Sequence, residues 1–383
     1  MSTDNINIPF IDLASQQKPI RSLIDKRIMD VLDHGKYIMG PEIAELEELL
    51  SEFTKAKHSI TCSSGTDALY LSLLAGGIGR GDAVFIPSYT FAATAEAVML
   101  CGATPVFIDV DPTCFNMVPS KLDEAIARIK KVNKLKPRAI ISVDLFGIPA
   151  PYSELCVIAK RHGLFLIADA AQSFGGSING NKVGTHADIT TTSFFPSKPL
   201  GCYGDGGAIF TDDDDTADIV RSIRAHGGSN QGKYDNVRVG MNARLDTIQA
   251  AILIEKLKIF PDELRSRQLI AERYAESLCN VVDVPSVPEG VLSAWAQYTI
   301  ATDHRDELCA HLKAHDIPTQ IYYPKPLHKQ LPYQESQAIS GELPITDKLS
   351  QTLMSLPMHP YLATEVQDRI TQCIKLFFDE NYA

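Results

Sequence analysis

Two residues with complementary chemistry, Asp169 and Lys198, stand 29 positions apart in the chain. Asp169 ends an apolar run, Leu164 to Ala168, whose composition is typical of a strand covered on both faces. Lys198 follows a second β-type run and precedes a glycine-rich turn, a setting in which a free ammonium is costly. Loss of water lowers the pKa of a lysine, and its neutral amine can then attack an aldehyde carbon. Taken alone, Asp169 also fits a helix cap or an ion-pair partner, and a lone lysine is usually a solvated surface charge.

A carboxylate and a lysine on neighbouring strands are the pair that pyridoxal 5′-phosphate (PLP) requires. The lysine bonds the aldehyde carbon of the cofactor. The carboxylate keeps the ring nitrogen protonated, so that the ring can accept electrons from the substrate. Each unit by which the carboxylate raises the pKa of the ring nitrogen corresponds to about 1.4 kcal/mol. The pair therefore predicts an enzyme that uses PLP.

Two further segments could complete such a site. The stretch 61–69 (TCSSGTDAL) leads from a strand through small residues into a helix, and Gly65 would let a phosphate approach the N–H groups at the helix start. The stretch 87–94 (PSYTFAAT) puts Phe91 just beyond a strand, where its ring could stack on a flat cofactor. An ordinary helix cap and a packed aromatic side chain remain open as alternatives.

Short apolar runs and helical patterns alternate around these residues, which predicts a mostly parallel sheet with helices on both faces. The expected strands are 58–62, 83–86, 105–108, 138–143, 164–168, 189–194 and 207–211, and the expected helices 66–75, 92–101, 119–131 and 151–162. A helical pattern then covers 244–277, with Pro261 expected to kink or break it. The last part reads as strand 295–301, helix 304–315, strand 318–323 and helix 363–378. We therefore expect a large domain over 1–245 and a smaller α+β domain over 246–383.

Composition narrows the class of protein. The chain has 383 residues, of which 45% are hydrophobic and 22% charged, as in ordinary globular proteins. Its net charge of −11 argues against nucleic acid as a partner. The chain has no long apolar run and no signal-like start, which favours the cytoplasm. Its eight cysteines form no CxxC pair, which favours reduced thiols and argues against a metal site.

The motifs SSGTDAL, TFAATAEAV, DAAQSFG, SFFPSKPLGCYGDGGA, RVGMNARLD and SLPMHPYL follow one another in the chain. In this order they resemble the DegT/StrS-type sugar-nucleotide aminotransferases, which belong to the aspartate-aminotransferase superfamily of PLP enzymes (fold type I). The likeness extends from about Ile11 to Leu376. Within the family, the chain is most similar to enzymes that aminate C3 of a UDP-linked 2-acetamido-3-oxo-glucuronate, although those relatives carry histidine where Tyr322 stands.

The resemblance implies roles for individual residues. Lys198 would bind the cofactor and carry a proton, Asp169 would pair with the ring nitrogen, Gln172 would lie at the ring face or its 3-hydroxyl, and Phe91 would stack. The phosphate would be held by Gly65, Thr66, Ser193 and, from the other subunit, Asn242. This last role implies an obligate homodimer with shared sites.

The region of Tyr322, Tyr323 and His328 would approach the sugar, whereas His359 is expected to be structural. L-glutamate would be the amino donor, and the product an amino sugar for surface polysaccharide such as lipopolysaccharide O-antigen.

Segment 221–244 carries a local excess of positive charge in this acidic chain. The segment contains one acid, Asp235, and five basic residues, which are Arg221, Arg224, Lys233, Arg238 and Arg244. We expect the segment to attract the dianionic cofactor and an anionic sugar nucleotide, with Arg238 or Arg244 on the sugar carboxylate or diphosphate. A basic surface loop is the alternative.

Three other functions remain open. The chain could aminate another nucleotide-linked keto-sugar, such as a dTDP-3-keto-6-deoxyhexose or a GDP-4-keto-sugar. It could catalyse a different PLP reaction on small amino acids, or be a non-enzymatic member of the family. The intact lysine–aspartate pair counts against the last of these.

Overall fold

A seven-stranded sheet forms the centre of the larger body in this computed structural model, which describes residues 8–229 and 235–382. The strand order is β1-β9-β8-β5-β4-β2-β3. The strands are β1 (His58–Cys62), β2 (Asp82–Pro87), β3 (Thr104–Ile108), β4 (Lys136–Val143), β5 (Phe165–Asp169), β8 (Ile189–Ser193) and β9 (Gly207–Thr211). β9 runs antiparallel to β1 and β8, and the other neighbouring pairs are parallel. The mostly parallel sheet is confirmed, and the seven strands predicted for it each lie within two residues of an observed one.

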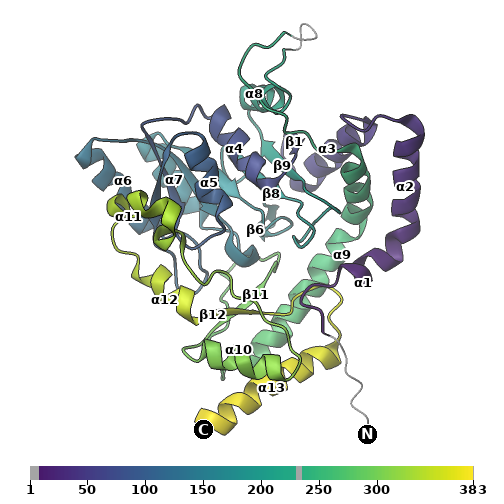
Figure 1. Cartoon of the computed structure of the whole chain (residues 1–383), viewed down its shortest axis with the longest axis vertical. Helices are drawn as coiled ribbons and strands as arrows, with labels where there is room; N and C mark the ends of the chain where they lie inside the picture. Colours follow the sequence, from purple (N-terminus) through teal and green to yellow (C-terminus); the bar gives the residue numbers. More distant parts are fainter. Residues whose placement is uncertain (1–7, 230–234, 383) are drawn as a thin grey trace.

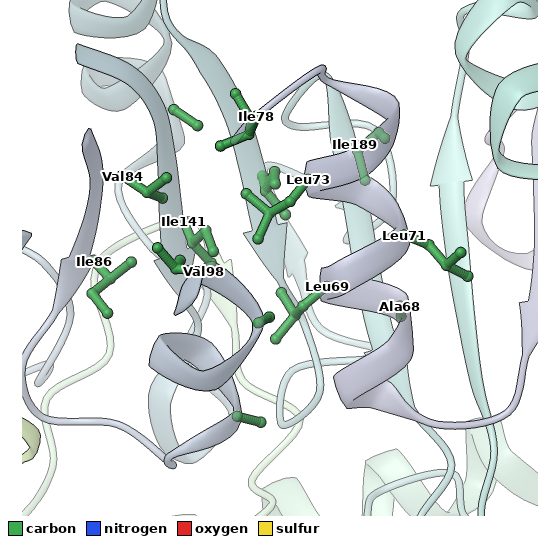
Figure 2. Close-up of a cluster of buried hydrophobic side chains, with 14 of the residues drawn as sticks. Ala68, Leu69, Leu71, Leu73, Ile78, Val84, Ile86, Val98, Ile141 and Ile189 are labelled. Carbon is green, nitrogen blue, oxygen red and sulfur yellow. The ribbon is translucent and has the colours of Figure 1, made fainter. Parts of the chain in front are cut away.

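Helices cover both faces of this sheet (Figure 1). They are α3 (Pro41–Thr54), α4 (Gly65–Ala75), α5 (Ala93–Leu100), α6 (Pro119–Val132), α7 (Tyr152–His162) and α8 (Asp214–Arg224). Alternate residues of β2 belong to different buried clusters, with Val84 and Ile86 on the α4–α5 side and Phe85 on the α6–α7 side. This alternation explains why the strands read as continuous apolar runs. Figure 2 shows Leu69 and Leu73 pointing from α4 toward the sheet, while Leu71 points the opposite way.

A second, smaller body lies below the first in Figure 1. Its two-stranded antiparallel sheet consists of β11 (Tyr298–Ala301) and β12 (Leu353–Leu356), and it packs with α10 (Arg305–Ala314) and α13 (Thr364–Tyr382) around a buried cluster of its own. The remaining helices are α1 (Leu13–Gln17), α2 (Arg21–His34), α11 (Gln334–Ser340) and α12 (Pro344–Thr352). The strands β10 (Val291–Leu292), β6 (Ser177–Ile178) and β7 (Asn181–Lys182) form a third sheet.

The long helix α9 (Thr247–Leu278) joins the two bodies. Its first half contributes Phe260 to the cluster of the larger body, and its second half contributes Tyr274 to that of the smaller one. Because α9 belongs to both clusters, the division at residue 245 stays a prediction. In the described part of the chain, no helix combines the length and apolar character needed to cross a bilayer.

Two expectations for this region are wrong: a break at Pro261 and a strand over 318–323. Pro261 does not end α9, which is continuous across it; the proline removes one backbone hydrogen bond, and Phe260 and Leu264 pack in the same cluster on either side of it. Segment 318–323 is not a strand: it makes an isolated bridge between Gln320 and Ser355, and the partner of β11 is β12.

Candidate active site

Asp169 and Lys198 come together at the carboxyl edge of the sheet. Asp169 is the last residue of β5 and pairs in register with Thr191 of the neighbouring β8, and the turn that follows β8 carries Lys198. The Lys198 N–H donates to Phe195 O at 2.9 Å, which closes this turn. Gly201 is required beside it, because a Cβ there would lie 2.5 Å from the same oxygen. Ligands bind at this edge in open α/β sheets.

Burial shifts the pKa values of this pair in opposite directions. Desolvation lowers the pKa of Lys198, and the charge of Asp169 acts against that shift. Desolvation likewise raises the pKa of Asp169, which is 7% exposed, while the N–H of Ala171 at 3.1 Å and the charge of Lys198 act against it. Each group therefore gains from an opposite charge at this site, and the amine is easier to deprotonate than in water.

A second buried acid, Asp144, lies at the end of the adjacent strand β4. Its N–H donates to the carbonyl of Asp169 at 3.1 Å, and its carboxylate accepts from the Tyr152 hydroxyl at 2.6 Å and the Ala150 N–H at 2.9 Å. Burial raises the pKa of Asp144 to about 7. The sequence analysis missed this residue, although it ends an apolar strand just as Asp169 does.

Gln172, Phe91 and Tyr323 form the next part of the site. The Gln172 side-chain oxygen accepts from the N–H of Phe146 at 2.6 Å, and its side chain also forms a hydrogen bond with the Tyr323 hydroxyl. The Phe91 ring lies 6.2 Å from the Tyr323 ring and remains 55% exposed. An exposed aromatic face beside a fixed amide is suited to stacking on a planar ligand.

The start of α4 lies against the end of β8. A Cβ on Gly65 would lie only 2.6 Å from Ser193 Cβ, and one on Gly207 would lie 2.5 Å from Ser64 O. Ser64 caps the helix by accepting from the N–H of Asp67 at 3.0 Å. Gly65, Thr66 and Ser193 are thus brought together around N–H groups that have no partner within the helix, an arrangement that suits a phosphate.

These parts fit PLP as a set. An amine of lowered pKa can hold the aldehyde carbon, and a buried carboxylate that makes no salt bridge within the described chain can pair with a protonated ring nitrogen. The exposed Phe91 ring offers a stacking surface, and the glycine-lined start of α4 offers an anion site.

The four described basic residues of segment 221–244 do not form one patch, which corrects the expectation from charge counting. Arg224 is buried and donates to Glu47 Oε1 at 2.6 Å and to Thr61 O at 2.7 Å, so its charge is already paired. Arg221 lies within 3.7 Å of the Asp218 carboxylate at the surface, and Lys233 lies outside the described residues. Only two of the five remain as candidates for an anionic ligand, Arg238 and Arg244.

Within the described chain, residues 225–229 and 235–242 form an arm that lies above α8 in Figure 1. Arg238 and Asn242 are exposed on this arm. Arg244, at the base of the arm, is half-buried, and its Nε has no hydrogen-bond partner among the described residues. No hydrogen bond or ion pair among the described residues of this chain joins Arg238 or Arg244 to Lys198.

The three residues expected near the sugar differ in their surroundings. Tyr323 and Tyr322 are half-buried neighbours, and both are anchored through Tyr89, whose hydroxyl donates to Tyr322 O at 2.8 Å and accepts from Tyr323 N at 2.9 Å. His328 is only 3% exposed, with Nδ1 2.7 Å from Ser88 Oγ and Nε2 3.1 Å from the Asp347 carboxylate. Both its nitrogens are bound within the protein, so the geometry favours a role in positioning over direct sugar contact.

Comparisons with known proteins match the chain over almost its whole length. The family model for the DegT/DnrJ/EryC1/StrS aminotransferase family matches residues 19–375. The UDP-2-acetamido-2-deoxy-3-oxo-D-glucuronate aminotransferase of Pseudomonas aeruginosa is 47% identical over 358 residues, which cover 93% of this chain and 96% of that protein. A crystal structure of a DegT DnrJ EryC1 StrS aminotransferase from Brucella abortus has a TM-score of 0.94 at 51% identity, covering 97% of this chain and 99% of that one. NtdA from Bacillus subtilis, solved with bound cofactor PMP, has a TM-score of 0.89 at 29% identity over 99% of this chain and 87% of its own.

Proposed function

Because this chain belongs to the DegT/DnrJ/EryC1/StrS aminotransferase family, whose enzymes use PLP, we propose that it aminates C3 of UDP-2-acetamido-2-deoxy-3-oxo-glucuronate with L-glutamate as donor. The observation that carries the proposal is the 47% identity to an enzyme of that name over nearly the full length of both chains. The amino sugar would then enter surface polysaccharide such as lipopolysaccharide O-antigen, and the enzyme would work in the cytoplasm.

The residues around Lys198 divide the chemistry between them. PLP supplies the electron sink that makes the donor's Cα–H acidic. Lys198 Nζ would hold the cofactor and, once free, would take the proton from that Cα; burial lowers the pKa of Lys198, which makes its neutral amine more available. Asp169 would keep a proton on the ring nitrogen, Gln172 would fix the ring edge, and Phe91 would cover one face of the ring and exclude water there.

Arg244 is our candidate for the anionic part of the sugar nucleotide. Its Nε lacks a partner among the described residues, and a guanidinium binds a carboxylate or a phosphate through two parallel hydrogen bonds. The two negatively charged groups of the proposed substrate, the glucuronate carboxylate and the diphosphate, are both suitable. Arg238 on the exposed arm is the second candidate.

The arm also supports a homodimer with shared sites. Val239 is 94% exposed and Val237 56% exposed on a segment that projects from the body (Figure 1). Apolar side chains in such a position are stabilised when a second copy covers them. Asn242 of one subunit would then reach the phosphate site of the other.

A mixing experiment tests the shared site. Lys198→Ala and Asn242→Asp chains are each expected to be inactive alone, the second because a carboxylate repels the cofactor phosphate. After the two are unfolded and refolded together, hybrid dimers contain one site with both native residues, and activity should return. No recovery in refolded mixtures would contradict the sharing.

The specific substrate is tested with a panel of UDP-, dTDP- and GDP-linked keto-sugars offered to the amino form of the enzyme. The competing function, amination of another keto-sugar, is favoured by relatives named as dTDP-amino-sugar transaminases, which are 34% identical to this chain. We expect fastest turnover with the UDP-linked 3-oxo-glucuronate. Faster turnover of a dTDP- or GDP-linked sugar would replace the proposed substrate.

Arg244→Ala should raise KM for the sugar roughly ten- to a hundredfold, the loss expected for a hydrogen bond to a charged group, and leave PLP content unchanged. Arg221→Ala, at the surface of α8, is the control and should change neither quantity. Loss of PLP without an effect on KM would argue against this role of Arg244.

A further inference from the structure

Three metal-ligating side chains meet where α10 packs on α13. His311 lies in the last turn of α10, and His315 caps the same helix one turn later. Cys373 comes from α13 and is 7% exposed. One ligand atom from each residue lies within 4.8 Å of the other two. The group is outside the residues of the proposed active site.

The hydrogen bonds at the end of α10 leave a histidine nitrogen free to bind a metal. His315 Nδ1 lies 2.8 Å from His311 O. A carbonyl oxygen only accepts, so Nδ1 carries the proton and donates, and Nε2 keeps its lone pair. Metal-bound histidines usually have their other nitrogen held by such a second contact.

The surrounding residues fix the two helices against each other. Arg369 of α13 donates to His315 O at 2.6 Å, and the His311 ring packs 5.3 Å from the Phe377 ring. Burial raises the pKa of the Cys373 thiol, and the charge of Arg369 acts against this shift. The ligands are therefore carried by a tied helix pair instead of by loose surface loops.

We propose that His311, His315 and Cys373 bind one divalent cation of the Zn²⁺ type, with water as the fourth ligand. Imidazole nitrogen and thiolate sulfur are the ligands that Zn²⁺ prefers. Bond lengths of about 2.1 Å to nitrogen and 2.3 Å to sulfur place tetrahedral ligands roughly 3.5 Å apart, so the ligand atoms, which lie within 4.8 Å of one another, would draw closer on binding. Binding displaces the thiol proton to the solvent and cross-links α10 to α13.

The sequence predicts no metal site, because its cysteines and histidines lack the ligand spacings of known zinc motifs. The two histidines are four residues apart, but the cysteine follows 58 residues after His315. Only the packing of α10 on α13 brings them together.

Cobalt binding to the full-length, chelator-treated protein tests the proposal. Co²⁺ in a tetrahedral site with a thiolate gives intense visible bands at longer wavelengths than PLP absorbs. We expect one Co²⁺ per chain with these bands, displaced by Zn²⁺, and a rise in Tm of a few degrees on Zn²⁺ addition. His315→Gln and Cys373→Ser should abolish the bands and the rise in Tm.

His304→Gln, at the other end of α10, and Cys156→Ser, an exposed cysteine on α7, are the controls and should keep both signals. If Cys373→Ser does not fold, His315→Gln still decides, because that side chain is exposed. Absence of the tetrahedral bands from the wild type, or their persistence in His315→Gln, would overturn the proposal.

Discussion

At the scale of single residues, the site depends on Lys198 and Asp169, two groups whose charged forms are disfavoured by burial. Burial lowers the pKa of Lys198 and raises that of Asp169, so a protonated cofactor ring satisfies the acid while the amine becomes available. This relation could be predicted from the sequence, because both residues follow strand-like runs. Asp144 carries the same sequence signal at the end of β4, but its contacts with Tyr152 and with the Asp169 backbone could not be predicted from the sequence.

Asp169→Asn should separate the charge of this residue from its shape. The amide is nearly isosteric with the carboxylate but cannot keep the ring nitrogen protonated. If the pKa of that nitrogen falls by two units, the protonated form and with it the rate fall by about a hundredfold. We expect single-turnover amination to slow by at least about that factor while Tm changes little. Asp218→Asn, an exposed acid on α8, is the control. An Asp169→Asn enzyme with wild-type rates would contradict the role given to this carboxylate.

At the scale of elements, the sheet positions the site by ending several parallel strands at one edge. Long, continuous apolar runs made these strands predictable, since burial on both faces leaves little ambiguity. Of the pair β11 and β12, only β11 was predicted, because short strands are stabilised by the strands they pair with. Gln320 forms an isolated bridge and not the predicted strand. Charge counting misjudged Arg224 because a sequence does not show burial or the ion pair with Glu47.

The close approach of α4 to β8 gives a prediction for this element. Gly65→Ala would place a methyl group 2.6 Å from Ser193 Cβ, so the start of the helix must move away from Ser193, which distorts the proposed phosphate site. We expect the Kd for PLP to rise about tenfold or more, the loss of one hydrogen bond to a charged group, as measured by equilibrium dialysis.

The matched control is Gly79→Ala, where the new Cβ would meet Cys101 O at an ordinary 3.7 Å. This variant should bind PLP like the wild type. Equal cofactor affinities for the two variants would show that the α4–β8 contact does not shape the phosphate site.

At the scale of the whole molecule, α9 and the N-terminal segment tie the two bodies together. His359 follows β12 in the segment where Met358 N donates to Phe10 O at 3.4 Å. His359 is buried, and desolvation lowers its pKa from 6.5 to about 4, with the charge of Asp12 acting in the other direction. The histidine is therefore neutral in the folded protein at neutral pH.

This shift predicts an acid-sensitive stability. The unfolded chain binds a proton at His359 below about pH 6.5, but the folded protein does so only near pH 4, so stability falls as pH drops through that window. The loss amounts to about 3 kcal/mol from this one group. In His359→Gln, the free energy of unfolding measured in urea should depend less on pH between 6.5 and 4. His304→Gln, half-exposed on α10, should keep the wild-type dependence, and unchanged behaviour of His359→Gln would refute the assignment.

The central claim is that Lys198 and its neighbours bind PLP and accept an amino group from L-glutamate. The most direct test is the absorbance of the purified protein with PLP, before and after glutamate, for the wild type and for Lys198→Ala. We predict a visible band of the bound cofactor that glutamate bleaches in the wild type and leaves unchanged in Lys198→Ala. A wild-type protein with no such band, or with a band that neither glutamate nor the substitution alters, would contradict the account and leave this fold without transaminase chemistry.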